Sequence, residues 1–354
     1  MPLSALFDKF SKSIIYVNGS LAFVMNVTLL HFIVFHSKKH MGTYKYLMLC
    51  FSAFNLLYCT MHIVVMPNFH AKGRGFVVIP TSFLKFSMKA GYWGCLMYGC
   101  LFIQSLVLLA FHFVYRYLLI CKNDWLFVFN SWKYVPIHFS IWLTVGILWI
   151  IFVGIYMYHG EILTGYFQYE LWEIYRVDLN KTPSLGPLYK YPNALGVEVW
   201  DWGVLMASGI CVSEMCASFS VILFCTWKIH HFFETSASTM SDKSRSLQMQ
   251  LFRALLIQTV IPVIFEYIPC ALNFGCPFLG IPFGRGANFT PILVSFYPVL
   301  DPMSLLYFIK DYRYALFKKL RLKDRSISDS SSKKRASAYT PQQTISTTET
   351  AALN

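Results

Sequence analysis

Three acidic residues lie inside long apolar segments of the chain, where a charge is costly. They are Glu214, Glu266 and Asp301. A carboxylate at membrane depth destabilises a fold by several kcal/mol unless it has a partner, so each acid predicts a functional contact. Glu214 and Glu266 fall on segments that we expect to be neighbours. Three roles stay open for them: binding a cationic or hydrogen-bonding ligand, coordinating sodium, or sharing a proton.

Prolines accompany the acids in the last two apolar segments. Asp301 is followed by Pro302, which removes a backbone hydrogen bond and bends the helix around the acid. Pro262 lies in the middle of the segment 251–272, where a hinge would let the inner half of a helix swing. A structural kink without a switching role is the alternative at both positions.

One arginine stands where the third apolar segment ends, in the sequence LAFHFVYRYLLICK. Arg116 and its neighbour Tyr117 would lie at the cytoplasmic edge of a helix bundle. A guanidinium there can reach neighbouring helices, or the backbone carbonyls of a partner, with several donors at once. The alternative is an arginine that only extends its charge to the membrane surface.

These residues can come together only if the segments that carry them form helices across a bilayer. The composition predicts such helices. Of the 354 residues, 56% are hydrophobic and only 13% are charged, against about a quarter in soluble proteins. The segment 76–90 is too interrupted by proline and lysine to cross a membrane. Apolar segments of membrane-helix length lie at 14–35, 45–66, 91–118, 137–158, 203–228, 251–272 and 289–309. The sequence therefore predicts an all-α membrane protein, a seven-transmembrane helix bundle.

The distribution of basic residues predicts how the chain is oriented. Ten of the thirty Lys and Arg residues follow the seventh segment, which places that end in the cytoplasm. An odd number of spans then leaves the N-terminus outside. The sequon at Asn180 agrees with this orientation. Asn180 is a glycosylation candidate only if the loop 159–202 is lumenal. The net charge of +13 thus indicates contact with the lipid bilayer and no nucleic acid.

Composition divides the chain into four parts. Residues 1–13 are a short extracellular N-terminus, and 14–309 are the transmembrane domain. Residues 310–323 predict a basic amphipathic cytoplasmic helix, and 324–354 a disordered tail rich in Ser and Thr whose hydroxyls are candidate phosphorylation sites. The loop 159–202 is acidic and aromatic, and both an ordered lid and a solvated loop fit it.

A small apolar ligand fits between helices, in a mostly hydrophobic cavity with few polar anchors. On the outer halves of the predicted helices, the candidate ligand-binding residues are Tyr98, Gln104, Glu214, Glu266, Tyr267 and Phe296. None of the ten cysteines forms a CxxC pair or stands beside a histidine at metal-ligand spacing, so we expect no metal site and no cofactor. Cys95, and Cys276 in a loop on the same side, are the disulfide candidate.

Four separated motifs carry a resemblance to a known family. They are GTYKYLM (42–48), HFVYRY (112–117), LQMQLFRALLIQTVIP (247–262) and YPVLDPM (297–303), the last followed by IKDYR (309–313). In this order and spacing the chain resembles the nematode seven-transmembrane chemoreceptors of the Str type, over nearly all of 14–323. The resemblance implies a rhodopsin-like G-protein-coupled receptor in the plasma membrane of sensory cilia, which detects a small-molecule odorant. It also implies a heterotrimeric G protein as partner, with receptor kinase and arrestin.

The resemblance gives roles to two pairs of residues. Arg116-Tyr117 resembles the pair with which rhodopsin-like receptors engage the G-protein α subunit when the bundle opens. Asp301-Pro302 resembles the Asn/Asp-Pro step of their seventh helix. The chain departs from the pattern because no acid immediately precedes Arg116, and Leu305 stands where a tyrosine is expected. The loop 159–202 also lacks a cysteine, so the usual resting ion pair and the usual bridge to the third span are both missing.

Other classes of membrane protein fit less well. A transporter or ligand-gated channel is the alternative, but it would favour polar residues along a continuous path and two related halves, which the sequence lacks. A retinal pigment is excluded because no lysine lies between Phe289 and Ile309. An enzyme is not expected, because the intramembrane histidines share no motif. We therefore predict a receptor in which the ligand favours one state of the bundle.

Overall fold

The computed structural model describes residues 3–37, 42–158, 160–235, 242–281 and 283–319. Seven helical segments in these ranges are long and apolar enough to cross a membrane, which confirms the predicted bundle. The third, α3 (Met88–Cys121), carries Arg116. The others are α1 (Leu3–His36), α2 (Tyr44–Val65), α5 (Val135–Tyr156), α7 (Trp202–Thr235), a sixth span made of α8 (Asp242–Pro262), η5 (Val263–Tyr267) and α9 (Ile268–Leu279), and α10 (Phe289–Phe308).

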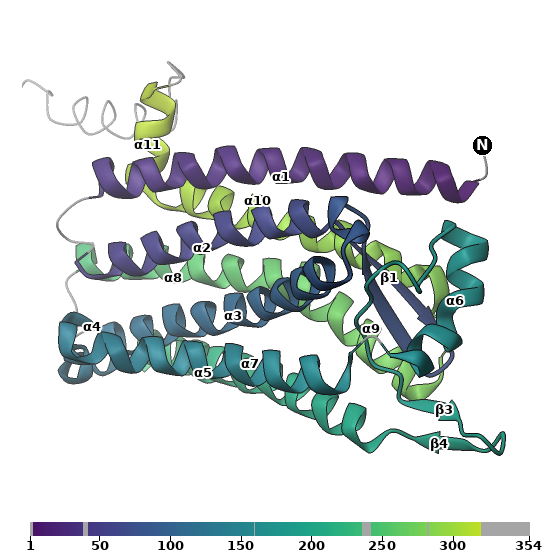
Figure 1. The fold of residues 1–354 in the computed structure, drawn as a ribbon. Coiled ribbons are helices and arrows are strands. Elements are labelled where there is room, and N and C mark those ends of the chain that lie inside the picture. Colours follow the sequence, from purple (N-terminus) through teal and green to yellow (C-terminus); the bar gives the residue numbers. More distant parts are fainter. Residues whose placement is uncertain (1–2, 38–41, 159, 236–241, 282, 320–354) are drawn as a thin grey trace, which may run out of the picture.

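Helix α3 runs through the middle of the bundle, with α2, α5 and α7 packed against it (Figure 1). Its side chains are apolar nearly all round, as expected for a helix buried on every side. Helix α10 packs against α1 and α8. Small residues allow close approach: a Cβ on Gly146 of α5 would lie only 2.3 Å from Nε2 of Gln104 on α3.

The sixth span is not a continuous α-helix. Pro262 ends α8, and the next five residues form the π-helix η5. Pro269 then sits in the first turn of α9, where its missing N–H costs no hydrogen bond. A π-turn is a weak point in a helix and often marks a functional site. The irregularity therefore lies where the proline spacing predicts a hinge.

A small sheet covers the outer end of the bundle. Strands β1 (Pro67–Lys72) and β2 (Gly75–Pro80) form an antiparallel hairpin, and residues 185–188 pair with the free edge of β2. The segment 76–90 is thus not a span, as expected; it forms most of β2, the short helix η2 (Phe83–Phe86) and the start of α3. A second hairpin joins β3 (Lys190–Pro192) and β4 (Glu198–Trp200).

The loop 159–202 is largely ordered, and its helix α6 (Glu161–Tyr175) lies on the sheet. Successive residues of β2 point to opposite faces. Phe76 and Val78 face the bundle core, whereas Val77 and Ile79 pack under Phe167 and its neighbours on α6. Sheet and helix together form a roof of two layers, at the same end of the molecule as the start of α1 (Figure 1).

At the opposite end, short turns join the spans and one more helix follows α10. The turns are η3 (Asn123–Trp125), α4 (Phe127–Asn130) and η4 (Trp132–Tyr134), while η6 (Gly284–Asn288) precedes α10 at the roof. Helix α11 (Lys310–Lys319) occupies most of the predicted amphipathic helix. The remainder of that segment and the predicted tail 324–354 lie outside the described residues.

The disulfide expectation is not met. Cys95 and Cys276 are both free thiols, and Cys95 is buried in the core. Cys276 belongs to α9 and not to a loop, because the sixth span continues to Leu279. The apolar periodicity of the sequence does not reveal where this helix ends. Asn180 is exposed just after α6, on the roof side of the bundle.

Candidate functional site

A cavity of about 90 Å³ lies in the outer half of the bundle, directly under the roof. Its walls come from α3, α5, the sixth span and α10, and its ceiling from β2 and residues 185–187. The lining is mostly apolar and aromatic, which is typical of sites for small organic ligands. The lining includes Phe76, Val78, Tyr98, Leu185, Glu266, Cys270, Asn273, Phe274 and Thr290.

Glu266, on η5, is the one carboxylate in this lining. Its side chain is 0% exposed, and neither carboxylate oxygen accepts a hydrogen bond from any described residue. The Tyr58 hydroxyl interacts with it electrostatically, but not at hydrogen-bond geometry. A buried acid left without a partner is costly. A ligand that brings a hydrogen-bond donor or a positive charge would remove that cost.

Two further polar groups border the cavity. The Tyr98 hydroxyl lies 3.1 Å from Nδ1 of His62 on α2, and its ring stacks on Tyr58. Asn273 donates to the Thr290 hydroxyl at 2.8 Å, which leaves its own Oδ1 without a hydrogen-bond partner in the described structure. An apolar space with a few fixed polar anchors can orient a small ligand.

The structure brings together only some of the predicted ligand-binding residues. Tyr98 and Glu266 line the cavity, and Tyr267 lines a neighbouring crevice, where its hydroxyl lies 3.1 Å from that of Ser218. The other three line neither space. Gln104 packs against Gly146, Glu214 lies on α7 near the Cys100 thiol, and Phe296 contacts Phe265.

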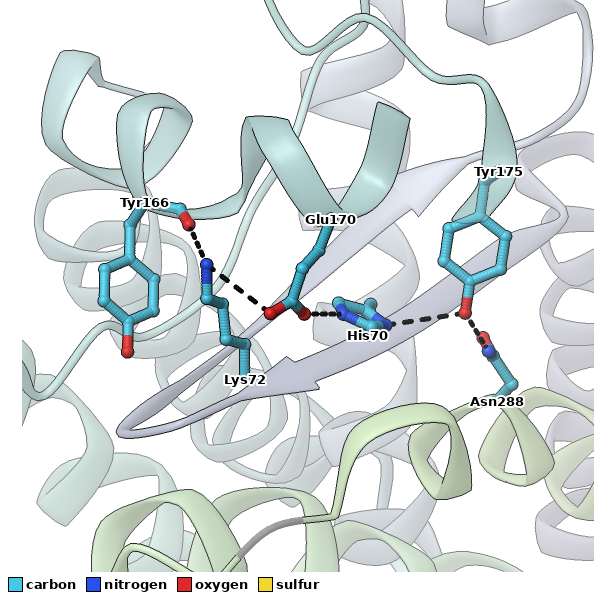
Figure 2. Close-up of polar contacts among 6 residues, drawn as sticks. All are labelled: His70, Lys72, Tyr166, Glu170, Tyr175 and Asn288. Carbon is cyan, nitrogen blue, oxygen red and sulfur yellow. Dashed lines mark hydrogen bonds and ion pairs between the residues drawn. The ribbon is translucent and has the colours of Figure 1, made fainter. Parts of the chain in front are cut away.

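A polar network on the outer side ties the roof to the bundle (Figure 2). Nε2 of His70, on β1, lies 2.9 Å from a carboxylate oxygen of Glu170 on α6. The other Glu170 oxygen lies 3.5 Å from Nζ of Lys72, which also donates to the Tyr166 carbonyl at 2.8 Å. The Tyr175 hydroxyl joins Nδ1 of His70 to Asn288, at the start of α10. The network therefore links β1, α6 and the seventh span.

His70 is the titratable centre of this network. Burial lowers the pKa of His70 below its ordinary value of 6.5, and the Glu170 carboxylate only partly offsets this effect. The charges of Arg285 and Lys72 lower the pKa of His70 further. The imidazole is therefore neutral at pH 7, and the network in this structure contains a neutral histidine.

A second polar cluster lies deeper, around the predicted switch residue Asp301 on α10. Its carboxylate is fully buried and accepts hydrogen bonds from Asn55 of α2 at 3.0 Å and from Gln258 of α8 at 2.8 Å. Pro302 follows inside the same helix and is buried. The acid is thus not a simple cap on a kink. It connects the second, sixth and seventh spans.

Arg116 lies at the inner end of α3 and is only 1% exposed. Its guanidinium sits 3.7 Å from the centre of the Tyr44 ring, and Nη1 donates to Oε1 of Gln248 on α8 at 3.3 Å. Nε and Nη2 have no hydrogen-bond partner among the described residues. Tyr117 instead faces α7, where it contacts Phe224. Arg116 is therefore held inside the bundle and does not extend to the membrane surface.

Sequence reasoning missed the partners of both switch residues. Gln248 and Gln258 stand in the segment LQMQLFRALLIQTVIP, and Asn55 stands inside the second span. The available signal was an amide side chain inside an apolar segment, since such groups hydrogen-bond across helices. That signal does not tell which helix each amide meets, so the pairing needed the structure.

Comparison with known proteins gives a consistent assignment. Residues 11–317 match the family described as serpentine type 7TM GPCR chemoreceptor Str. Serpentine receptor class r-10 of Caenorhabditis elegans is 31% identical over 331 residues, which cover 90% of this chain and 94% of that protein. G-protein coupled receptor str-33 of the same species is 24% identical, over 83% of this chain and 86% of that protein.

The fold comparison extends beyond nematode proteins. Squid rhodopsin matches with a TM-score of 0.58 at 12% identity, over 98% of this chain and 90% of that chain. The likeness shows a shared seven-helix architecture. The family match covers nearly the whole bundle, including Arg116, Glu266 and Asp301. The chain therefore belongs to the Str family of serpentine seven-transmembrane chemoreceptors, which are multi-pass membrane receptors of the G-protein-coupled class.

Proposed function

We propose that this receptor binds a small environmental odorant in the cavity under the roof and then activates a heterotrimeric G protein. The observation that carries the proposal is Glu266, a fully buried acid in a mostly apolar cavity, whose carboxyl oxygens have no hydrogen-bond partner among the described residues. A ligand with a hydrogen-bonding group or a positive charge would satisfy this acid. The proposed ligand is therefore a small, mostly apolar molecule with one such group.

The sixth span offers a path from the cavity to the inner face. It carries Glu266 in the cavity, Gln258 bonded to Asp301, and Gln248 bonded to Arg116. Pro262 lies between Glu266, which is on η5, and the other two residues, which are on α8. A ligand that favours a different arrangement at η5 would tilt the inner half of the span about this hinge. The proposed result is loss of the bond from Gln248 and release of Arg116.

Release of Arg116 would expose a guanidinium at the inner end of the bundle. In the proposed active state it contacts backbone carbonyls of the G-protein α subunit, for which its several donors are suited. The Arg116–Gln248 bond then takes the place of the resting ion pair that the sequence lacks. The same proposal places the receptor in the plasma membrane of a sensory cilium, with receptor kinase and arrestin acting on its cytoplasmic end.

The test replaces the cavity acid while keeping its shape. Cells that express the receptor are screened with an odorant panel by their calcium responses, and each agonist is then assayed on Glu266→Gln. We expect a potency change of up to about tenfold, the equivalent of one hydrogen bond. Output without ligand should not change.

Glu214→Gln is the matched control, because Glu214 is also an acid inside a span but lines neither cavity nor crevice. Its dose–response curve should overlay that of the unmodified receptor. An identical curve for Glu266→Gln, at equal surface expression, would remove Glu266 as the anchor and with it the proposed ligand site.

A further inference from the structure

A second and larger space opens beside the cavity, on the outside of the bundle. It is a crevice of about 690 Å³ between α7 and the outer part of the sixth span. Helix α7 packs closely on α3 and α5 but only sparsely on α9. The Ser218–Tyr267 pair marks the inner end of the crevice, and Tyr189, whose hydroxyl donates to the Phe274 carbonyl at 3.3 Å, marks its outer end.

The chemistry of the crevice selects against charge. No Asp, Glu, Lys, Arg or His lines it in the described structure. Two glycines, Gly209 of α7 and Gly275 of α9, line the crevice, and a Cβ on either would meet nothing within 4 Å. Nearby lining residues such as Val212 and Ile268 are about half exposed at the lipid-facing surface. The crevice is therefore open towards the hydrocarbon phase.

Only a thin partition separates the crevice from the cavity. Cys270 and Phe274 line both spaces. Both residues lie on α9, within two turns after the π-helix η5. The Phe274 ring rests edge-on against Phe76 of the roof, at 5.2 Å between ring centres. Movement of this ring is therefore one way to join the two spaces.

On the outer aqueous side, α6 and the sheet lie over the cavity, and Phe76, Val78 and Leu185 cover it. Backbone hydrogen bonds join Val78 and Leu185 in both directions, at 2.7 and 3.0 Å. The network around His70 fastens α6 to this sheet (Figure 2). Opening the roof would break all of these contacts together.

We infer that an uncharged, membrane-dissolved ligand enters the cavity sideways, through the crevice between α7 and α9. The inference rests on the proposed function and makes it more specific, because it names the ligand class: a neutral molecule that partitions into lipid and carries one hydrogen-bond donor, such as a medium-chain alcohol. The donor reaches Glu266 once the apolar part has passed Cys270 and Phe274.

The experiment measures the rate of entry and does not require signalling. The full-length receptor in phosphatidylcholine vesicles is mixed with a diazirine-bearing octanol, and flash photolysis at increasing times traps the probe. Mass spectrometry then separates adducts on cavity residues such as Glu266 from adducts in the crevice. Gly209→Phe and Gly275→Phe, the two plug variants, each place a ring in the open space of the crevice. Met206→Phe is the control, because it adds the same ring at an exposed site on α7 that does not line the crevice.

We expect both plugs to slow cavity labelling by about tenfold or more while the final level stays the same. A blocked route slows entry and exit equally, whereas a damaged site or a misfolded receptor would lower the final level. Met206→Phe should label like the unmodified receptor. If one of the two glycine variants fails to fold, the other one still tests the inference. Ala271→Phe, also at an exposed position that lines the crevice, then serves as the second plug variant.

Two outcomes overturn the inference. Cavity labelling at the unmodified rate in the plugged receptors would show that the ligand enters elsewhere. Adducts confined to the crevice would show a site that merely holds membrane-dissolved molecules, including lipid chains. Either outcome leaves the proposed function standing, because the Glu266→Gln assay tests that separately. Conversely, a receptor whose cavity fills through the crevice but that gives no signalling response would count against the proposed function alone.

Discussion

Removing the Gln248 side chain should activate the receptor without ligand. In the structure, Oε1 of Gln248 accepts the one hydrogen bond that the Arg116 guanidinium donates among the described residues, at 3.3 Å. Hydrogen bonds to charged groups contribute about 1.5–3 kcal/mol, and this long bond belongs at the lower end. A loss of about 1.5 kcal/mol shifts the equilibrium between resting and active states by about tenfold.

The size of the effect on output follows from that shift. If about 1% of the receptors are active at rest, which lies within the usual range for a minor state, Gln248→Ala raises the active fraction to about 9%. The measurement is ligand-independent nucleotide exchange on a co-expressed Gα, normalised to surface receptor. Ser246→Ala is the matched control, because Ser246 is exposed on the same turn of α8.

Unchanged basal exchange in Gln248→Ala, at equal surface expression, would refute the reasoning. It would mean that the cation–π contact with Tyr44 alone retains Arg116. An increase in Ser246→Ala of the same size would also count against it, because the effect would then come from the helix and not from the bond.

Two other perturbations test the remaining polar clusters. Gln258→Ala removes the 2.8 Å bond to Asp301, so the solubilised receptor should unfold at a lower temperature by the equivalent of about 1–3 kcal/mol; an unchanged midpoint would show that Asn55 suffices. For His70, burial holds the pKa below 6.5, so the closed roof is fully stable above about pH 6.5 and loses stability as the pH falls below it. Hydrogen-exchange protection of α6, corrected for intrinsic rates, should therefore fall between pH 7.5 and 5.5, and His70→Gln should abolish that dependence; equal dependence in both proteins would exclude His70 as its source.

Most of the fold could be predicted from the sequence, because lipid imposes strong constraints on length and polarity. All seven spans were expected, and the segment 76–90 was expected not to cross. The roof was not predicted in detail. Strand β2 is short and buried on both faces, so it reads as a plain apolar run without alternation. The π-turn η5 also has no signature beyond its neighbouring prolines.

Of the predicted ligand-binding residues, only Tyr98 and Glu266 line the cavity. Glu266, Arg116 and Asp301 stood out because ionisable groups are rare at membrane depth. Their surroundings depend on how each helix is rotated, and the sequence does not fix that rotation. Glu214 illustrates the limit: it looked equivalent to Glu266, yet it lines neither the cavity nor the crevice.

The most direct test of the whole account is agonist-driven recruitment of a Gα subunit to Arg116→Ala. The assay follows proximity of a labelled Gα to the receptor in cells treated with an agonist from the odorant panel, with surface expression measured in parallel. The account predicts clear recruitment to the unmodified receptor and none to Arg116→Ala at equal surface level. Equal recruitment to both receptors would contradict it.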